Sequence, residues 1–423
     1  MRRGPAEENR DAMAMQNYKP GRAAFLFIFI TVALDMIALG VMVPVLPKLI
    51  VSFEGGDYGS ASRIVGYFGI AWAFMQFVFQ PILGALSDRF GRRPVVLLSN
   101  VGLGLDYVVM ALAPTLGWLF LGRLISGAAS ASFSTASAYI ADITPADKRA
   151  ARFGMLGGAF GLGFVLGPAI GGYLGQIDLR LPFWFAAGLS LVNACYGFFV
   201  LPESLAPENR SKTFVWKTAH VLGSLRFLTR EPTLGLLSGA IFLSYLAHDS
   251  LPSLFVLYTG YRYHWDARTT GEVLALVGVA QTIVAAGLVR QAVKKFGELP
   301  TALFGLACGV AGFVVYALAP TGAVFLAALP LVALWGLAGP AFQGLATRFA
   351  GADEQGTLQG SIASLRGISG MIGPITYTQI MAWEIAGGRS PGGGYGLAAV
   401  LLALSLVFTL AVGRAKVAAR NAA

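Results

Sequence analysis

Charged side chains are scarce in this chain. Only 12% of its 423 residues are Asp, Glu, Lys or Arg, and 56% are hydrophobic. An average soluble protein carries about 25% charged residues. So little charge cannot cover a water-facing surface on a chain of this length, which excludes an ordinary soluble globular protein. The composition therefore predicts a protein whose main solvent is lipid.

Cysteine is rare, and the common catalytic motifs are absent. The two cysteines, Cys195 and Cys308, both fall inside hydrophobic runs, so they indicate neither a disulfide framework nor a redox compartment. The sequence has no GxxxxGK[ST], HExxH or CxxC pattern, and its Gly-x-Gly matches at 161–172 lack a preceding strand. We therefore predict a protein that is not an enzyme and that holds no metal and no other cofactor.

Long hydrophobic runs, in contrast, fill the chain. A membrane-spanning helix needs about 20 mostly apolar residues. The first run is too long for a signal peptide and no cleavage site follows it, so we interpret it as a retained span. Twelve transmembrane helices are predicted, at residues 23–47, 64–86, 94–113, 117–140, 152–175, 181–201, 234–258, 270–290, 299–319, 324–345, 358–384 and 393–415. The fold class is therefore an all-α membrane protein, with the lipid bilayer as a partner.

The net charge of +10 reflects topology. With twelve spans, most Lys and Arg residues lie on the side of the two termini, including those at 89–93, 148–152 and 210–230. Cytoplasmic loops carry such an excess, so both termini are predicted to be cytoplasmic. The basic excess is thereby explained without a nucleic-acid partner, and none is predicted.

An internal repeat divides the chain into two parts. ALAP occurs at 111–114 and again at 317–320, and Gly167-Pro168 matches Gly373-Pro374 at the same offset of 206 residues. The repeat predicts two parallel six-helix halves, at 23–201 and 234–415. A cytoplasmic segment (1–22), a linker (202–233) and a tail (416–423) complete the predicted domains.

Several motifs carry a family resemblance. GALSDRFGRRP at 84–94 resembles the signature loop between spans 2 and 3 of the major facilitator superfamily, and GFVLGPAIGG at 163–172 resembles the antiporter signature of its proton-driven drug exporters. Other segments resemble the tetracycline-resistance pump family, namely LD at 34–35, PVLP at 44–47, DY at 106–107, GR at 122–123, AYIADIT at 138–144, LPES at 201–204, HWD at 264–266 and QGTLQG at 355–360. The resemblance covers all twelve spans. It implies two halves that rock around a substrate near the membrane midplane.

Two positions depart from that family. Tetracycline exporters carry a histidine in span 8 and an aspartate in span 9, and Gln281 and Gly309 stand at the matching positions here. We therefore expect the chain to confer little tetracycline resistance. Gln281 is expected to line the substrate cavity.

Charged residues inside spans are costly and usually mark a pathway or a buried pair. Asp35 lies near the middle of span 1 and is the first candidate for a proton carrier, the alternative being a permanently paired structural carboxylate. Asp106 and Arg123 lie at similar distances from the turn at Pro114, which predicts a salt bridge between spans 3 and 4. That bridge is equally compatible with a structural role and with proton coupling. Asp35 and Arg123 are also expected to line the cavity.

Span 7 contains His248 and Asp249, which point about 100° apart on a helix, so one is expected to line the pathway while the other packs. Pro252 is expected to break or kink this helix. Arg366 in span 11 is expected to pair with Asp249, the alternative being an anionic substrate group. Both His248 and Asp249 are assigned to proton coupling.

Aromatic residues and small residues allow two interpretations. Tyr107 and Tyr245 are candidates for stacking on a substrate in the cavity, although most aromatic side chains in such a protein face lipid or the core. Gly167 and Pro168 are assigned to gating through the antiporter signature, although glycines in spans first indicate close helix packing.

The stretch 84–94 is expected to form a latch, by which we mean contacts that join the two halves at the cytoplasmic side. The resemblance implies that span 11 lies next to Gly84, where the missing side chain would permit close approach of the two helices. Asp88 would then lie at the start of span 11 near Thr357, where the helix dipole favours a carboxylate. Arg92 would reach Asp142 at the end of span 4.

The resemblance implies a proton-coupled antiporter that exports small amphipathic, drug-like compounds by alternating access from a bacterial inner membrane. No ATP site is visible, so the proton gradient is the expected energy source. The alternatives are a proton symporter for uptake of a small solute and a transport-inactive receptor or scaffold. A monomer is expected.

Overall fold

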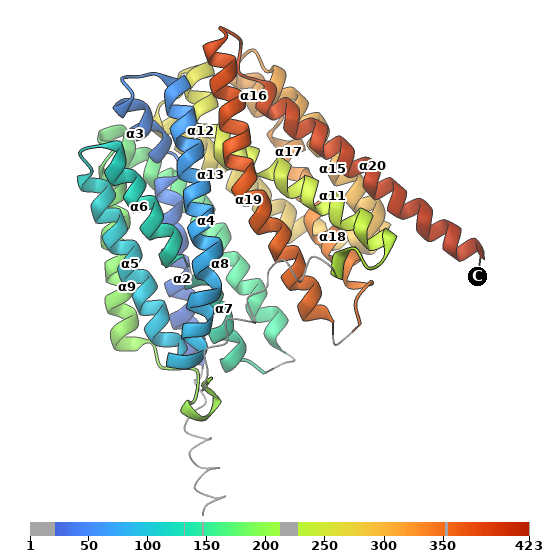
Figure 1. Cartoon of the computed structure of the whole chain (residues 1–423), viewed down its shortest axis with the longest axis horizontal. Helices are drawn as coiled ribbons and strands as arrows, with labels where there is room; N and C mark the ends of the chain where they lie inside the picture. The colour runs from blue at the N-terminus through green and yellow to red at the C-terminus, as the bar shows by residue number, and fades with distance from the viewer. Residues whose placement is uncertain (1–21, 131, 146–147, 212–226, 352–353, 423) are drawn as a thin grey trace, which may run out of the picture.

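The computed structural model describes residues 22–130, 132–145, 148–211, 227–351 and 354–422. Most of the predicted cytoplasmic segment, the middle of the linker and residue 423 of the tail therefore lie outside the described residues. Within the described ranges every regular element is a helix. Those helices group into the twelve segments predicted from hydropathy (Figure 1).

The N-terminal half contains six segments. Their helices are α2 (Arg22–Met42) with α3 (Leu46–Phe53), α4 (Tyr58–Phe90), α5 (Arg92–Leu112), α6 (Leu116–Ala129) with α7 (Ser132–Ile143), α8 (Arg149–Ile177) and α9 (Leu181–Val200). A short 3₁₀ turn, η2 (Pro207–Asn209), follows in the linker.

The C-terminal half contains the other six. Its helices are α11 (Pro232–His248) with α12 (Ser250–Tyr263), α13 (Ala267–Ile283) with the π-helical turn η4 (Val284–Leu288) and α14 (Val289–Phe296), α15 (Glu298–Leu318), α16 (Gly322–Ala327) with α17 (Leu329–Trp335) and α18 (Ala338–Thr347), α19 (Gln355–Ala386), and α20 (Gly393–Ala422).

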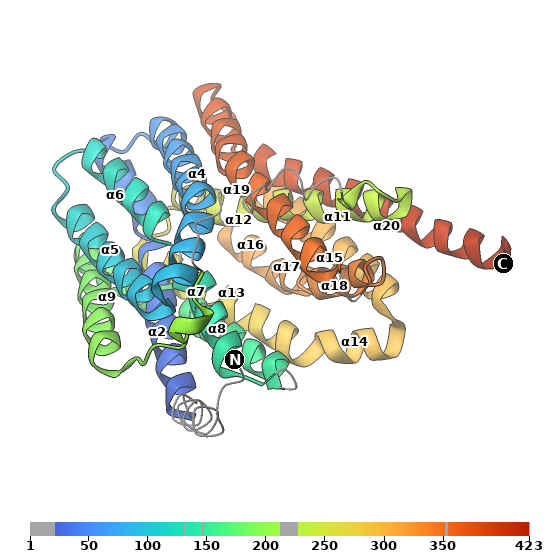
Figure 2. The same cartoon turned by 60° about the horizontal axis from the view of Figure 1, so that its bottom comes forward.

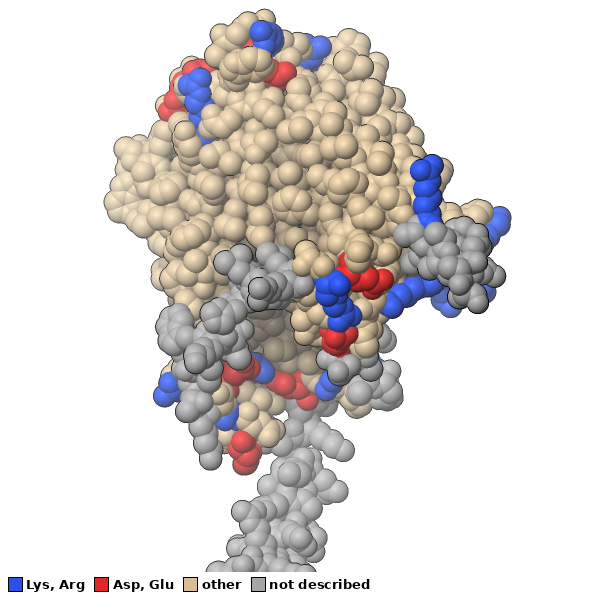
Figure 3. Space-filling model, turned by 45° about the vertical axis from the view of Figure 1, so that its right-hand side comes forward, with Lys and Arg blue, Asp and Glu red and all other residues tan. Residues whose placement is uncertain are grey.

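Eleven of the segments in the described part of the chain are long and apolar enough to span a membrane. The twelfth, α19, has 32 residues but is rich in Gly, Ser, Thr and Gln, which lowers its hydropathy. Lys, Arg, Asp and Glu gather toward the two ends of the face in Figure 3 and leave a broad uncharged band between them. Both features are typical of a bundle that crosses a bilayer.

Glycines set the distance between spans 1 and 5. A Cβ on Gly163 would lie 2.6 Å from the carbonyl carbon of Met36, and one on Gly167 would lie 2.6 Å from the Cα of Gly40. The backbones of α2 and α8 therefore touch directly, as small-residue interfaces in membranes allow. The interpretation of the span 5 glycines as packing residues is confirmed by these contacts, and the gating role of Gly167 and Pro168 stays a prediction.

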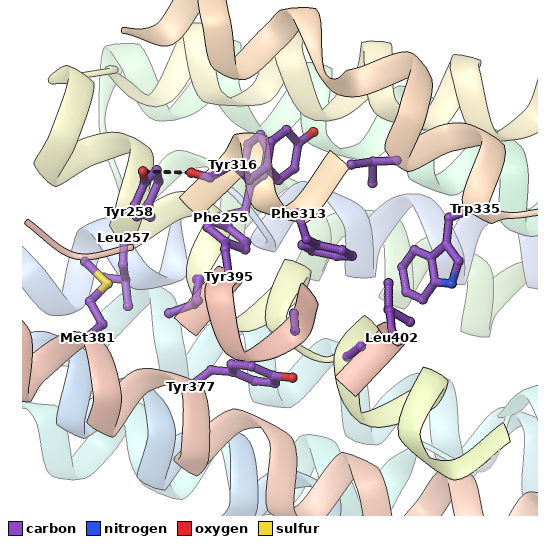
Figure 4. Close-up of a cluster of buried hydrophobic side chains, with 14 of the residues drawn as sticks. Phe255, Leu257, Tyr258, Phe313, Tyr316, Trp335, Tyr377, Met381, Tyr395 and Leu402 are labelled. Carbon is purple, nitrogen blue, oxygen red and sulfur yellow. Dashed lines mark hydrogen bonds between the residues drawn. The ribbon is translucent and has the colours of Figure 1, made fainter. Parts of the chain in front are cut away.

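An aromatic cluster holds one end of the C-terminal half together (Figure 4). The rings of Tyr316 and Phe325 stack with centroids 3.8 Å apart. The Tyr258 hydroxyl donates to the carbonyl oxygen of Tyr316 at 3.0 Å, which satisfies a polar group that burial would otherwise make costly. These packed rings stabilise the ends of α12, α15 and α16.

Among the described residues, the contacts between the two halves begin at one end and extend to about the middle of the spans. We call the ends the Pro114 end, where α5 turns into α6, and the Gly91 end, where α4 turns into α5. At the Pro114 end the ammonium of Lys48 donates to the Trp265 carbonyl at 2.5 Å, and the rings of Tyr58 and Tyr261 lie 5.6 Å apart. A Cβ on Gly271 would lie 2.7 Å from the Cα of Gly172.

The halves separate toward the Gly91 end, as the diverging paths of α4 and α19 in Figures 1 and 2 show. Among the described residues, a Cβ on Gly84, Gly154 or Gly360 would have no atom within 4 Å. Ion pairs at this end, such as Arg92 with Asp142 and Arg348 with Glu298, each stay within one half. The structure is therefore closed at the Pro114 end and open at the Gly91 end.

Candidate transport site

Asp35 lies in a polar pocket inside the N-terminal half. Its side chain is buried on α2, and the Asn193 amide of α9 donates to one of its oxygens at 2.9 Å. Asn100 of α5, with its amide turned to donate, lies 3.0 and 3.1 Å from the two carboxylate oxygens. The carboxyl group is thus held by amide donors from two other spans. These contacts all belong to one half, and cavity lining by Asp35 stays a prediction.

The predicted salt bridge between Asp106 and Arg123 is wrong for this structure. No nitrogen of Arg123 lies within ion-pair distance of the Asp106 carboxylate; instead Nη1 of Arg123 lies 3.4 Å from the Met42 sulfur. The guanidinium also lies over the Trp72 ring, 5.4 Å from its centroid. The guanidinium thus contacts α2 and α4, where the aromatic ring is a favourable partner for a cation, instead of the carboxylate on α5.

Asp106 is a buried carboxyl group that forms no hydrogen bond with the described residues. Its side chain is fully buried on α5, and neither carboxylate oxygen has a hydrogen-bond partner among the described residues. The charge of Arg123 acts on the carboxylate from a distance, and Ser126 is the hydroxyl donor beside it, outside hydrogen-bond geometry in this structure. Buried polar groups are rarely left without partners, and an ionised carboxylate in such a place would be costly.

Asp249 occupies the break in span 7. α11 ends at His248 and α12 begins at Ser250, and Pro252 explains why. Its nitrogen carries no hydrogen and cannot bond the carbonyl four residues earlier, so the helix cannot run through Asp249 unbroken. The predicted break near Pro252 is confirmed.

Asp249 and Arg366 form the predicted ion pair. Nη1 of Arg366 on α19 lies 3.2 Å from an Asp249 oxygen, and the Ser369 hydroxyl donates to the other oxygen at 2.5 Å. The Asp249 side chain is only 6% exposed, whereas that of His248 is 43% exposed. Asp249 is therefore the one of the two neighbours that packs, and lining of the pathway by His248 stays a prediction.

Aromatic rings flank this group. The guanidinium of Arg366 lies 5.2 Å from the centroid of the Tyr245 ring, and the His248 ring lies 5.8 Å from that of Trp335. Trp335 in turn fills the space beside Gly309, where a Cβ would lie 2.9 Å from the indole. The glycine that departs from the tetracycline-exporter pattern thus makes room for Trp335.

Two further cavity predictions have different outcomes. Gln281 is exposed near the end of α13, next to the π-helical turn, and its lining role stays a prediction. Tyr107 is 1% exposed and packs in the core of the N-terminal half. The prediction that Tyr107 lines the cavity is wrong in this structure, because the hydrophobic core encloses its ring.

The Gly91 end contains a network around Arg92. Its side chain donates to Asp142 at 3.1 Å and to the Ser87 hydroxyl at 2.8 Å, and it also pairs with Asp88. The contact predicted between Arg92 and Asp142 is confirmed. Gly91 permits the turn because its φ of 106° lies in the region that favours glycine.

The other half of the predicted latch is not formed. Asp88 contacts Arg92 rather than the start of α19, and Gly84 has open space where span 11 was expected. The physical reason is the separation of the two halves at this end. The close approach of α4 and α19 occurs instead near the Pro114 end, where a Cβ on Gly66 would lie 3.4 Å from the Cα of Ile375.

Sequence reasoning missed three polar residues. Asn100 and Asn193 carry no charge, so only their position inside apolar spans could have marked them. Glu203 accepts from the backbone nitrogen of Arg92 at 2.9 Å and thereby caps the first turn of α5. The LPES segment at 201–204 that contains Glu203 was the available signal.

Comparisons with known proteins agree with this architecture. The family model of the Major Facilitator Superfamily matches residues 25–374. The tetracycline resistance protein, class C, of Escherichia coli is 36% identical, covering 85% of this chain and 90% of the relative. The class B protein of Escherichia coli is 35% identical, with coverages of 82% and 86%.

Solved structures support the fold. The crystal structure of the human organic anion transporter MFSD10 superposes with a TM-score of 0.69 at 23% identity, covering 92% of this chain and 99% of that one. At this identity the likeness concerns the fold alone. The chain is thus a membrane transporter that belongs to the Major Facilitator Superfamily and is related within it to the tetracycline resistance proteins.

Proposed function

We propose that this transporter exports small amphipathic compounds in exchange for protons, by alternating access, with the proton gradient as its energy source. The observation that carries the proposal is the pair of buried carboxyl groups in the N-terminal half. Asp106 has no hydrogen-bond donor among the described residues, and Asp35 is held by amides. Burial without a hydrogen bond favours the neutral acid at Asp106. The amide donors around Asp35 favour its carboxylate, so Asp35 is proposed as the second carrier, which binds and releases the proton as these contacts change.

Each protonation changes the electrostatic balance of the N-terminal half. An ionised Asp106 attracts Arg123 back from Trp72, whereas a neutral Asp106 leaves the guanidinium on the aromatic ring. Protonation thus moves a charge beside α2 and α4, and α4 packs against α19 of the other half. Coupling requires only that proton and substrate favour different conformations, so the two need not share one site.

The relatives support the export direction. The tetracycline resistance proteins of Escherichia coli are named for a phenotype that outward transport of a drug would produce. We propose on the same grounds a monomer in a bacterial inner membrane, with the Gly91 end and both termini in the cytoplasm. The open Gly91 end then faces the side from which a compound is exported.

Everted vesicles test this proposal. A panel of toxic compounds, screened by growth of a drug-sensitive host, first identifies an exported compound. Adding it to acidified everted vesicles should release protons from the lumen of vesicles that contain the wild-type protein. Asp35→Asn and Asp106→Asn should abolish this release while the protein stays folded, and Glu208→Gln, an exposed carboxylate on η2, should not change it.

The outcomes separate the alternatives. Proton entry together with the compound would indicate a symporter instead. The absence of any coupled flux for every compound would leave a transport-inactive receptor or scaffold. Release that persists in both Asn variants would remove the two carboxyl groups from the mechanism.

A further inference from the structure

The group around Arg366 presents its positive charge outward and its negative charge inward. The Arg366 side chain is 42% exposed, whereas that of its partner Asp249 is 6% exposed. Asp249 is also enclosed by the Ser369 hydroxyl. A solute that reaches this surface therefore meets the guanidinium before it meets the carboxylate.

His248 extends the surface with a second donor. Nη2 of Arg366 lies 3.3 Å from Nδ1 of His248, and a guanidinium can only donate. Nδ1 must therefore accept, which places the proton of the neutral imidazole on Nε2. The half-exposed His248 ring then offers an N–H group next to the free donors of Arg366.

The surface lies where the two halves face each other. Gly367, the residue after Arg366, approaches the N-terminal half, since a Cβ there would lie 3.2 Å from the Phe77 ring of α4. The partly exposed ring of Tyr245 flanks Arg366, and the buried Trp335 lies against the His248 ring. Tyr245 thus provides an apolar surface beside a cluster of donors, the combination that binding sites for small molecules require.

We propose that Arg366 and His248 bind the carboxylate of an aromatic carboxylate substrate, whose ring packs against Tyr245. This inference rests on the proposed function, because it names the class of compound that the transporter moves. A cationic compound is disfavoured, since the guanidinium stands between it and Asp249. Arg366 suits the role because its planar fork matches a carboxylate through two hydrogen bonds.

A matched pair of probes tests the site by equilibrium binding, without any proton gradient. 2-Naphthoate and 2-naphthamide share the same ring system and differ in charge, and their affinities are measured by calorimetry on the purified full-length protein in lipid nanodiscs. The wild type should bind the naphthoate at least about tenfold more tightly than the amide, as a charge-assisted hydrogen bond predicts. Arg366→Gln should remove that preference, whereas Arg290→Gln on α14 should retain it.

A substitution of Asp249 tests whether its carboxylate competes with the substrate for Arg366. Asp249→Asn should tighten naphthoate binding about threefold or more, because the guanidinium loses its competing carboxylate. The double variant Arg366→Gln with Asp249→Asn keeps the pair uncharged and should bind both probes equally, which controls for misfolding of the single Gln variant.

Three results would overturn the inference. They are wild-type protein that binds no naphthoate or binds both probes equally, a preference that survives Arg366→Gln, and loss of naphthoate binding in Asp249→Asn. Because binding needs no transport, these results are independent of whether proton exchange is observed in vesicles.

Discussion

At the scale of single residues, Asp249 shows how a membrane helix accommodates a charge. The break between α11 and α12 places the carboxylate where Arg366 and Ser369 supply donors from α19. Removing a partner from a buried charge costs more than the bond itself contributes, because the charge stays behind.

Ser369→Ala should therefore destabilise the protein. A hydrogen bond to a charged group contributes about 1.5–3 kcal/mol, so the free energy of unfolding should fall by about that amount. The measurement is an SDS titration in mixed micelles. Thr376→Ala on the same helix is the control, because its exposed hydroxyl bonds only a carbonyl of its own helix; equal losses in both variants would contradict the assignment.

Asp266 stabilises the start of α13 outside the membrane. Its carboxylate accepts from the Thr269 backbone nitrogen at 2.7 Å, and hydrogen bonds from Thr269 lower the pKa of Asp266 in the folded protein. A carboxylate whose pKa is lowered by folding stabilises the folded protein at pH values above its pKa in the unfolded chain, which is about 3.9 for Asp. That contribution is lost as the pH falls through the folded-state pKa.

Asp266→Ala should reduce the free energy of unfolding at pH 7 by about 1 kcal/mol, the usual cost of losing an N-cap. The difference from wild type should shrink as the pH falls below about 4. Thermal unfolding at several pH values measures both effects. Glu272→Ala, which removes only an exposed pair with Arg268, should have little effect at any pH, and a pH-independent loss in Asp266→Ala would count against the capping role.

The residues that sequence reasoning found and those it missed differ in one property. Asp35, Asp249 and Arg366 were identifiable because a charge inside an apolar run is rare. Asn100 and Asn193 were not, because an amide in a span becomes significant only when helix rotation directs it toward a carboxylate. The failed Asp106–Arg123 bridge has a similar cause, since only the three-dimensional structure places Trp72 beside Arg123.

At the scale of helices, the glycines of α8 differ in what surrounds them. Those that contact α2, such as Gly163, leave no room for a methyl group, whereas Gly154 and Gly157 face open space at the Gly91 end. The same helix therefore provides both a test and its control.

Gly163→Ala should destabilise the protein by about 1–3 kcal/mol, because the added methyl group collides with the backbone of Met36 and overpacks the interface. Gly157→Ala should be neutral or stabilising by about 0.5–1 kcal/mol, the helix preference of alanine over glycine. Unfolding in mixed micelles gives both values. Similar values for the two variants would show that α2 and α8 do not pack as described.

The internal repeat also extends to the ion pairs. Arg92 pairs with Asp142 in the first half, and Glu298 pairs with Arg348 in the second. Each partner lies 206 residues after its counterpart, so the position of the pair is repeated while its charges are exchanged. The number of helices was predictable from hydropathy and the repeat from residues that match at one offset. The breaks in the segment of α16, α17 and α18 were not predictable, because they depend on packing.

At the scale of the whole molecule, the structure represents one of the states that transport requires. The halves touch at the Pro114 end through Lys48 and Trp265 and separate at the Gly91 end. This state could not be predicted from the sequence, because one sequence must encode both. The predicted contact of Asp88 with the start of span 11 stays a prediction for the opposite state.

Alternating access coupled to protonation is the central claim, and paired distances test it most directly. Spin labels at Gly154 and Arg290 report the Gly91 end, and labels at Gln176 and Arg268 report the Pro114 end, in a background without Cys195 and Cys308. Lowering the pH from 8 to 5 should change the two distances in opposite directions in the wild type, and Asp35→Asn with Asp106→Asn should abolish that dependence. Wild-type distances that are the same at pH 8 and pH 5, or that change in the same direction at both ends, would contradict the account.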